Sequence, residues 1–278
     1  MSLTRIKLIP QKSISIGRRT SAIRYVSHYA DNDVLVCGIA RTPIGKLGGS
    51  LSSFKATELG AHAIRSAVER SLIGKQCIEE VFMGNVVSAG IGQAPARQSA
   101  MYAGLPLDVA CTTVNKVCAS GMKAAMLASL SIMSGYRQVC IAGGMESMSN
   151  IPYYLPGART GYRLGNNTVV DGLINDGLWD VYNNQHMGNC GELCAAKYGI
   201  SREDQDSFAV SSYSRAQQAW EGGRFDYEVS PITVDAKKGK TVVSTDEEYG
   251  GLQEEKLRSL RPAFKKDGTV TAANASKL

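Results

Sequence analysis

The sequence predicts an α/β fold: a layered core with a parallel-rich sheet covered by helices, and a turn-rich loop domain inserted into it. Three observations support this class. Patterns typical of buried strands and of helices alternate between residues 34 and 142. Hydrophobic residues make up 44% of the 278 residues, which is enough apolar material for a large core. Proline and glycine become frequent after residue 150, as expected of a long excursion between regular elements.

The core elements follow from the periodicity of apolar residues. The continuous apolar run over residues 34–40 predicts a strand, which ends at Arg41-Thr42-Pro43. Apolar residues at helical spacing predict a helix from residue 55 to residue 72, and Gly74 ends it. The alternation continues with predicted strands at 80–87, 109–114 and 138–142 and predicted helices at 94–104 and 122–133. Because strands and helices alternate, the strands are expected to be parallel and covered on both faces.

The stretch after residue 150 contains one clear predicted helix and a candidate hairpin. Ser201 suits a helix N-cap, acidic residues follow it in the first turn, and Gly222-Gly223 ends the helix. Two runs, 229–234 and 241–244, flank Lys238-Gly239-Lys240 and predict the hairpin. The sequence thus divides into an N-terminal segment, a core, a loop domain and a segment returning to an incomplete core, at residues 1–30, 31–150, 151–262 and 263–278.

The formal net charge of +6 is concentrated at the N-terminus. Residues 1–30 contain six Lys and Arg and no acid, which leaves 25 basic residues against 25 acidic ones in the remainder. This balance lacks the electrostatic footprint of a nucleic-acid binder, so no nucleic-acid partner is predicted. Spaced basic residues with Ser, Thr and isolated Leu and Ile predict a mitochondrial transit peptide, and hence the matrix, with a disordered basic tail as the alternative. No uncharged apolar stretch of about 18 residues predicts a membrane span.

The cysteines and one basic segment offer weaker motifs. Seven cysteines, an odd number without a secretory signal, are expected to be reduced thiols. Cys190 and Cys194 lie near His186, but no second ligand pair accompanies them, so a helix face is favoured over a metal site. Residues 238–241 resemble the end of a phosphate-binding loop, yet Val234 stands where that motif needs glycine. Neither motif is therefore a candidate site.

Cys118 is the candidate nucleophile. The predicted strand at 109–114 leads into a short turn, and Cys118 lies at or just before the start of the next predicted helix. The positive end of a helix dipole and its exposed N–H groups stabilise a thiolate at such a position. Ala119, Ser120 and Gly121 are small enough for a thioester to approach. Position alone leaves a buried structural cysteine as the alternative.

The segment from Asn115 to Met122, Asn-Lys-Val-Cys-Ala-Ser-Gly-Met, resembles the nucleophile segment of the thiolase family. Three further segments match that family in the expected order: Ala40–Gly45, Ala142–Met148 and Thr271–Ser276. The resemblance covers residues 34–278 and implies the N-terminal half of a thiolase-like layered core. His186-Met187-Gly188 is similar to the short-chain, acetoacetyl-CoA branch, in which the His and Met line the acyl and pantetheine region.

Residues 212–215 and 272–275 resemble those of the potassium-responsive mitochondrial form of the family. That resemblance implies a possible K⁺ site at Tyr213, Ala272, Ala273 and Ala275. It also implies that coenzyme A, as substrate and product, lies near Tyr213, Lys256 and Ser276, with no covalently bound cofactor. The basic run from Lys256 to Lys266 is either a solvated face or a contact for the coenzyme phosphates.

The resemblance implies reversible Claisen condensation of two acetyl-CoA to acetoacetyl-CoA and CoA through an acetyl-Cys118 intermediate. The reverse reaction is thiolysis of acetoacetyl-CoA or 2-methylacetoacetyl-CoA. A homo-oligomer, dimer or tetramer, is also implied. The family's Asn-Glu-Ala-Phe segment, Gly-His-Pro segment and second cysteine have no match here, so we expect a thiolase sequence truncated before its C-terminal half. The alternatives are an inactive fragment or isoform that binds acyl-CoA or a full-length thiolase partner, and a ketosynthase-type condensing enzyme.

Overall fold

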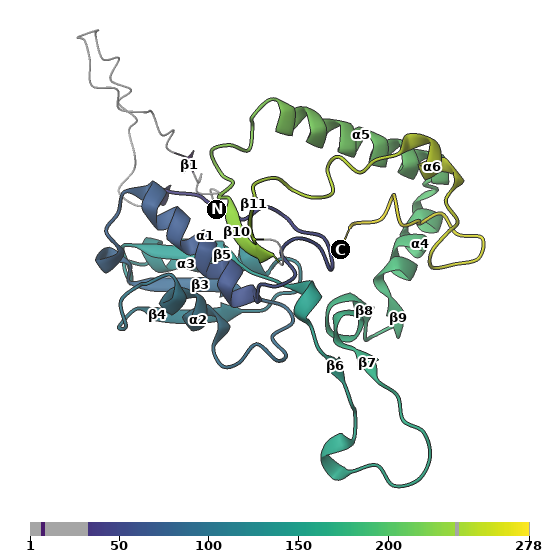
Figure 1. Ribbon diagram of the computed structural model, residues 1–278, viewed down its shortest axis with the longest axis horizontal. Coiled ribbons are helices and arrows are strands. Elements are labelled where there is room, and N and C mark those ends of the chain that lie inside the picture. Colours follow the sequence, from purple (N-terminus) through teal and green to yellow (C-terminus); the bar gives the residue numbers. More distant parts are fainter. Residues whose placement is uncertain (1–6, 9–32, 237–238, 278) are drawn as a thin grey trace.

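The computed structural model describes residues 7–8, 33–236 and 239–277 (Figure 1). The predicted transit peptide lies outside these residues, except for Lys7–Leu8, which form β1. This strand pairs in parallel with β2, Leu35–Val36. The sheet and its helices lie on one side of the molecule, and long helices and a projecting arm occupy the other (Figure 1). Within the described residues, no helix is both long enough and apolar enough to cross a lipid bilayer.

The central sheet has three parallel strands in the order β4-β3-β5. They are β3 at Glu80–Gly84, β4 at Ala110–Val114 and β5 at Cys140–Gly144. Glu80 lies opposite Ala110 on one side and opposite Cys140 on the other, so the three strands end together at one edge. The predicted parallel α/β class is confirmed.

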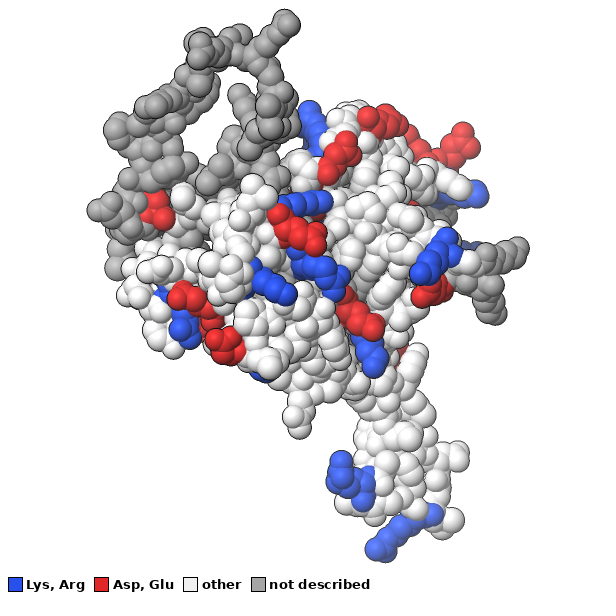
Figure 2. Space-filling view, turned by 60° about the vertical axis from the view of Figure 1, so that its left-hand side comes forward, with Lys and Arg blue, Asp and Glu red and all other residues white. Residues whose placement is uncertain are grey.

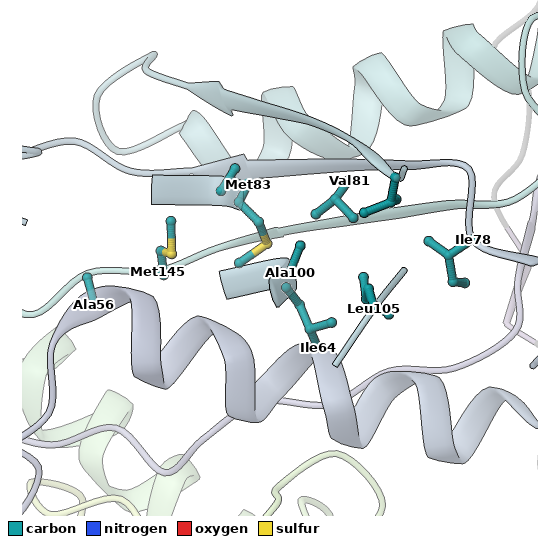
Figure 3. Packing of buried hydrophobic residues seen from close by; sticks show 10 residues of the cluster. Ala56, Ile64, Ile78, Val81, Met83, Ala100, Leu105 and Met145 are labelled. Atoms are coloured by element: carbon teal, nitrogen blue, oxygen red, sulfur yellow. The ribbon is translucent and has the colours of Figure 1, made fainter. Parts of the chain in front are cut away.

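Helices cover both faces of this sheet: α1 at Ala56–Ser71, α2 at Pro95–Tyr102 and α3 at Ser120–Met133. Val81 and Met83 of β3 point to α1 and α2, and their cluster includes the residues labelled in Figure 3. Phe82, between them, points to the opposite face, where it packs on Ala124 and Ala128 of α3. This alternation along one fully buried strand explains why the run is apolar throughout.

The predicted strand at 34–40 is wrong over most of its length. Only Leu35–Val36 is in a strand, and it pairs with β1 rather than with the three-stranded sheet. Further along, the backbone of Arg41 bonds the segment at 228–230, donating to Glu228 and accepting from Ser230. The backbone at the end of the apolar run therefore pairs with a segment that is distant in sequence, and not with the three-stranded sheet.

The chain after residue 150 is richer in helices than predicted. Its helices are α4 at Met187–Tyr198, α5 at Arg202–Glu221 and α6 at Glu254–Ser259, with a short π-helix at Leu173–Leu178. Only α5 was predicted, and its start is confirmed because Ser201 and Asp204 form a reciprocal capping box. α4 begins at a histidine N-cap and contains two glycines, and α6 has only six residues. Both therefore lack the usual start signals or length.

Short strand pairs lie before α4 and between α5 and α6. The predicted hairpin is confirmed as β10, Ile232–Ala236, paired with β11, Gly239–Val243. The others are β6 at Tyr153–Tyr154 with β7 at Val170–Asp171, and β8 at Trp179–Asp180 with β9 at Gln185–His186. Residues 155–169, between β6 and β7, form an arm that projects from the body (Figure 1). Figure 2 shows only basic charge on this arm, which carries Arg159 and Arg163.

Helix α1 ties the core to the chain that re-enters it after α5. The Arg70 guanidinium donates to the carbonyls of Ile39, Tyr227, Glu228 and Val229 at 2.8–3.1 Å. About two turns earlier in α1, His62 Nε2 lies 3.0 Å from Ser230 Oγ. His62 is thus half-buried, and burial lowers the pKa of its imidazole. The division of the chain at residues 150 and 262 stays a prediction.

Candidate active site

Cys118 lies in the turn between β4 and α3, at the edge where the three parallel strands end. β4 ends at Val114, Ala119 is the N-cap of α3, and the helix begins at Ser120. The Cys118 side chain is exposed. The alternative of a buried structural cysteine is therefore wrong for this position.

The other sheet cysteines differ from Cys118. Cys111 in β4 and Cys140 in β5 are partly buried, and burial raises the pKa of both thiols. A raised pKa lowers the thiolate fraction, and the thiolate is the reactive form. Exposure at the head of a helix therefore distinguishes Cys118 from the cysteines within the sheet.

The turn before α3 is strained and held by short hydrogen bonds. Val117 has φ of +49°, a left-handed conformation that a β-branched residue rarely adopts. Ser120 Oγ accepts from the Lys116 amide at 2.8 Å and donates to the Val117 carbonyl at 2.6 Å. The Asn115 side chain accepts from the Val117 amide at 3.0 Å. These bonds fix the backbone on both sides of the strained residue, directly before Cys118.

The first turn of α3 lies against the ends of β3 and β5. A Cβ on Gly84 would come within 2.6 Å of the Ser120 carbonyl carbon and 2.7 Å of the Gly121 nitrogen. A Cβ on Gly144 would lie 3.5 Å from Cα of Gly121. Glycine at position 84 is thus needed for the helix to approach the sheet, which sequence reasoning did not detect. The available signal was a glycine at the end of a buried strand.

A second polar group at this edge was also missed. Glu146, just after β5, accepts hydrogen bonds from the Val86 amide at 2.8 Å and from Asn85 Nδ2 at 3.0 Å. Burial raises the pKa of the Glu146 carboxyl, and these hydrogen bonds oppose that shift. Glu146 belongs to the segment Ala142–Met148, which was singled out only as a match to the family.

His186 and Met187 lie at the start of α4. His186 is the N-cap, and its Nδ1 accepts from the Gly188 amide at 2.9 Å. Its ring stacks on Phe264, with centroids 4.9 Å apart. Met187 is 41% exposed. Cys190 and Cys194 follow within α4. The described part of the chain holds no group of three or more His, Cys, Asp or Glu side chains that could bind a metal ion.

The return segment is held between α4 and α5. Glu192 of α4 accepts from the amides of Thr269 and Val270 at 2.8–2.9 Å. Asn274 Nδ2 donates to Asp206 of α5 at 2.9 Å. Burial opposes ionisation of Glu192, but the bonds from Thr269 and Val270 outweigh it and keep the pKa of this carboxyl below its usual value. Two acidic side chains, Glu192 and Asp206, thus bind the return segment through hydrogen bonds.

Tyr213 lies on α5, Lys256 is exposed on α6, and Ala272–Ser276 belong to the return segment. In the described chain, no hydrogen bond reaches the Tyr213 hydroxyl or the carbonyls of Ala272, Ala273 and Ala275. These are uncharged oxygen atoms, the type of ligand that coordinates K⁺. Residues 254–259 pack on α5 through Arg202, which donates to the carbonyls of Leu257 and Leu260 at 3.0 Å.

The predicted site residues therefore form two groups. Met187, Tyr213 and Lys256 lie on α4, α5 and α6, His186 is the N-cap of α4, and Ser276 belongs to the return segment. Cys118 lies in the turn between β4 and α3, and Figure 1 shows these two elements on the other side of the molecule from α4, α5 and α6. Over the described ranges, no hydrogen bond or ion pair joins Cys118 to the other group. Contacts within the second group run through Phe264, Glu192 and Asp206, which link its helices to the return segment.

Comparisons with known proteins point to one family. Residues 34–278 match the family model for the thiolase N-terminal domain. The chain is 54% identical over 249 residues to acetyl-CoA acetyltransferase 1 of Arabidopsis thaliana, covering 88% of this chain and 60% of that protein. It is 52% identical over 256 residues to the mitochondrial acetyl-CoA acetyltransferase of Rattus norvegicus, covering 91% of this chain and 60% of that protein.

A solved structure agrees with these relatives. A thiolase from Ascaris suum in complex with coenzyme A aligns with a TM-score of 0.82 and 42% sequence identity, covering 87% of this chain and 62% of that one. The chain thus spans about 60% of the length of the relatives that it matches.

Proposed function

Because the chain belongs to the thiolase family, we propose that the protein carrying it is an acetyl-CoA C-acetyltransferase. It joins two acetyl-CoA molecules reversibly into acetoacetyl-CoA and CoA, and in reverse it cleaves acetoacetyl-CoA or its 2-methyl analogue. The observation that carries the proposal is the exposed Cys118 sulfur in the strained turn before α3. The relatives named acetyl-CoA acetyltransferase support the choice of substrate.

The chemistry begins with attack of the Cys118 thiolate on the carbonyl carbon of acetyl-CoA. The new carbon–sulfur bond forms as the bond to coenzyme A breaks, and CoA leaves as a thiol after taking a proton. A second acetyl-CoA then loses an α-proton, and its carbon attacks the acetyl-Cys118 carbonyl. This step forms a carbon–carbon bond and releases the Cys118 sulfur, so the enzyme thiol is regenerated.

Both half-reactions need a base, and the described histidines are engaged elsewhere. His62 bonds Ser230, and His186 caps α4 and stacks on Phe264. A base for Cys118 and an acid–base group for the α-carbon must therefore be sought in the longer protein that the relatives exemplify. This is why we assign the activity to that protein.

We place coenzyme A on the second group of residues: Tyr213, Lys256, Ser276, His186 and Met187. The exposed Lys256 amine suits a phosphate, and the exposed Met187 side chain suits the acyl and pantetheine region. The carbonyls of Ala272, Ala273 and Ala275 with the Tyr213 hydroxyl would hold K⁺ beside the coenzyme. The ion would supply positive charge and brace the return segment.

The arm at 155–169 supports the proposed homo-oligomer. It extends from the body (Figure 1), and Leu155, Leu164 and Val169 on it are 55%, 100% and 59% exposed. Large apolar side chains exposed on a projecting segment are typical of a protein interface. A second copy of the chain is the proposed partner, in a dimer or tetramer.

One observation favours a second candidate, a form of residues 1–278 that acts by joining a full-length thiolase. Met122, Met126, Leu130 and Met133 of α3 are 69%, 52%, 56% and 40% exposed and share one face of the helix. The opposite face packs on the sheet through Ala124 and Ala128. An exposed apolar stripe on the free face of a helix is typical of a surface that binds another protein.

Intact mass after addition of acetyl-CoA tests the proposed enzyme. The protein should gain one acetyl group, and Cys118→Ala should abolish the gain. Cys77→Ala is the control and should retain the gain, because Cys77 is also exposed but lies on a 3₁₀ turn before β3, distant in sequence from Cys118. An adduct that persists in Cys118→Ala contradicts the assignment.

We also propose import into the mitochondrial matrix, directed by residues 1–30. Several of the matched relatives are named mitochondrial. N-terminal sequencing of the protein from purified mitochondria should begin near residue 30. A sequence that begins at residue 1 or 2 contradicts cleavage of a transit peptide.

A further inference from the structure

Glu146 and Cys118 are connected by a chain of hydrogen bonds through the carboxyl edge of the sheet. Glu146 Oε2 accepts from the Val86 amide at 2.8 Å. The carbonyl of the same residue, Val86, accepts from Asn115 Nδ2 at 3.1 Å. Asn115 Oδ1 then accepts from the amide of Val117 at 3.0 Å, and Cys118 is the next residue. Each link is a bond with ordinary geometry.

We propose that Glu146 and Asn115 are positioning residues that hold the strained Val117 turn in the conformation that presents the Cys118 sulfur. The proposal rests on the role of Cys118 proposed above. Neither side chain is required to touch substrate. Their function is to fix the backbone from which the nucleophile projects, as groups behind a reactive side chain do in other sites.

The hydrogen-bond network is needed because the backbone at Val117 is strained. A β-branched residue at φ of +49° is unfavourable, so the turn relaxes unless surrounding bonds fix it. Ser120 fixes it from the helix side, by its bonds to Lys116 and Val117. Asn115 fixes it from the strand side and is itself held by Val86. Without Asn115, the Val117 amide loses its acceptor and the turn can rotate toward an ordinary conformation.

Glu146 anchors the far end of this network. Its carboxylate also accepts from Asn85 Nδ2 at 3.0 Å, and Asn85 is 1% exposed. Asn85 in turn donates to the Met145 carbonyl at 3.2 Å. Residues 85–87, which leave β3, are thereby fixed to residues 145–146, which leave β5. Val86, whose carbonyl accepts from Asn115, is thus bonded on its amide side to Glu146.

Glu79 offers a matched control at the opposite end of the same two strands. Its Oε2 accepts from the amides of Gln138 and Val139, directly before β5. Glu79→Ala therefore removes a carboxylate that links the β3 and β5 segments, as Glu146→Ala does, but far from Cys118 along each strand.

The test compares Glu146→Ala, Asn115→Ala, Asn115→Asp and Glu79→Ala in the protein that carries this chain. The readouts are the rate of acetylation by acetyl-CoA, the rate of Cys118 alkylation by iodoacetamide measured on its peptide, and the melting temperature. We expect Glu146→Ala and Asn115→Ala to slow both reactions about 10- to 100-fold, because a displaced reacting group has that effect. The acetyl-CoA concentration for half-maximal rate should not change.

The controls separate positioning from stability. Glu79→Ala should lower the melting temperature without slowing either reaction, and Asn115→Asp, which keeps the acceptor for Val117, should lose less rate than Asn115→Ala. Equal rates in Glu146→Ala and Glu79→Ala overturn the proposal. If Glu146→Ala does not fold, the two Asn115 variants decide. Equal reaction rates in Asn115→Ala and Asn115→Asp then overturn the proposal.

A separate outcome concerns the proposed function. If the unaltered protein gains no acetyl group, the acyltransferase proposal fails, while the alkylation rates still decide whether Glu146 and Asn115 position Cys118.

Discussion

Arg41 and Asp246 are joined by two hydrogen bonds, Nη1 to Oδ1 at 2.8 Å and Nη2 to Oδ2 at 3.2 Å, across 205 residues of sequence. The Arg41 Nε also donates to Glu228 at 2.7 Å, and the guanidinium lies 5.2 Å from the centre of the Phe225 ring. Asp246 accepts further bonds from the Ile44 amide and the Trp220 indole. One side chain from the segment before α1 thus contacts two segments of the chain beyond residue 220, at 225–228 and at 246.

Replacement of Arg41 should release this junction. Arg41→Lys keeps the charge but cannot form the paired bonds, and we expect the free energy of unfolding to fall by about 1–3 kcal/mol. Arg258→Ala is the control, since its contact with Glu254 at 3.8 Å joins two exposed side chains. That change should cost about 0–0.5 kcal/mol. If chemical denaturation gives equal losses of unfolding free energy for the two variants, the Arg41 junction stabilises the fold no more than an exposed ion pair does.

Two neighbouring glycines should respond differently to alanine. Gly84→Ala places a Cβ 2.6 Å from backbone of α3, so the helix must shift, and we expect a loss of about 1–3 kcal/mol. Gly121→Ala meets its nearest atom at 3.7 Å, an ordinary contact, and alanine favours a helix. Melting temperatures should fall for Gly84→Ala and hold or rise for Gly121→Ala. The reverse order contradicts the packing described here.

The anchor at Glu192 predicts a dependence of stability on pH. The folded chain keeps the pKa of this carboxyl below its ordinary value of 4.5, so the ionised form stabilises the fold above that value. This stabilisation is lost as the pH falls through the lowered pKa. The difference in unfolding free energy between the unaltered protein and Glu192→Gln should therefore narrow below pH 4.5. A difference that stays constant with pH rules out this linkage.

Residues 1–278 produced alone should bind a hydrophobic dye and aggregate. The reason is the apolar stripe on α3, whose central members Met126 and Leu130 are 52% and 56% exposed. Lysine at both positions should reduce dye fluorescence and increase the soluble fraction. Leu72→Lys is the control, because Leu72 is 87% exposed but stands at the end of α1, outside the stripe. A sharp cooperative melt of a monomer without dye binding contradicts this prediction.

Local sequence patterns predicted the core well because the periodicity of apolar residues within each strand or helix reflects the face that the element buries. The three sheet strands and the helices α1, α2 and α3 lie within a few residues of their predicted positions. The strand at 34–40 failed because its pairing depends on distant partners, β1 and the segment near Glu228. Apolar composition indicates that such a run is buried but does not indicate what it bonds.

The sequence predicted only that part of the candidate site that depends on neighbouring residues, and not the part that depends on distant contacts. Cys118 could be found because a strand, a turn and a helix start lie together in sequence. Glu146 could not, because its bonds to Asn85 and Val86 span 61 and 60 residues. The strain at Val117 was also invisible, since the residue type favours a different backbone conformation and only the fixed bonds around it reveal why it is tolerated.

The excursion after residue 150 leaves and re-enters the core beside one helix. At its start, Asn150 Nδ2 donates to the Phe54 carbonyl at 2.9 Å, just before α1, and at its end His62 of α1 meets Ser230. Both attachment points lie on α1 or directly before it, so the chain between them starts and ends beside one element of the core. A change in the length or sequence of this intervening chain should therefore leave the sheet and the turn before Cys118 in place.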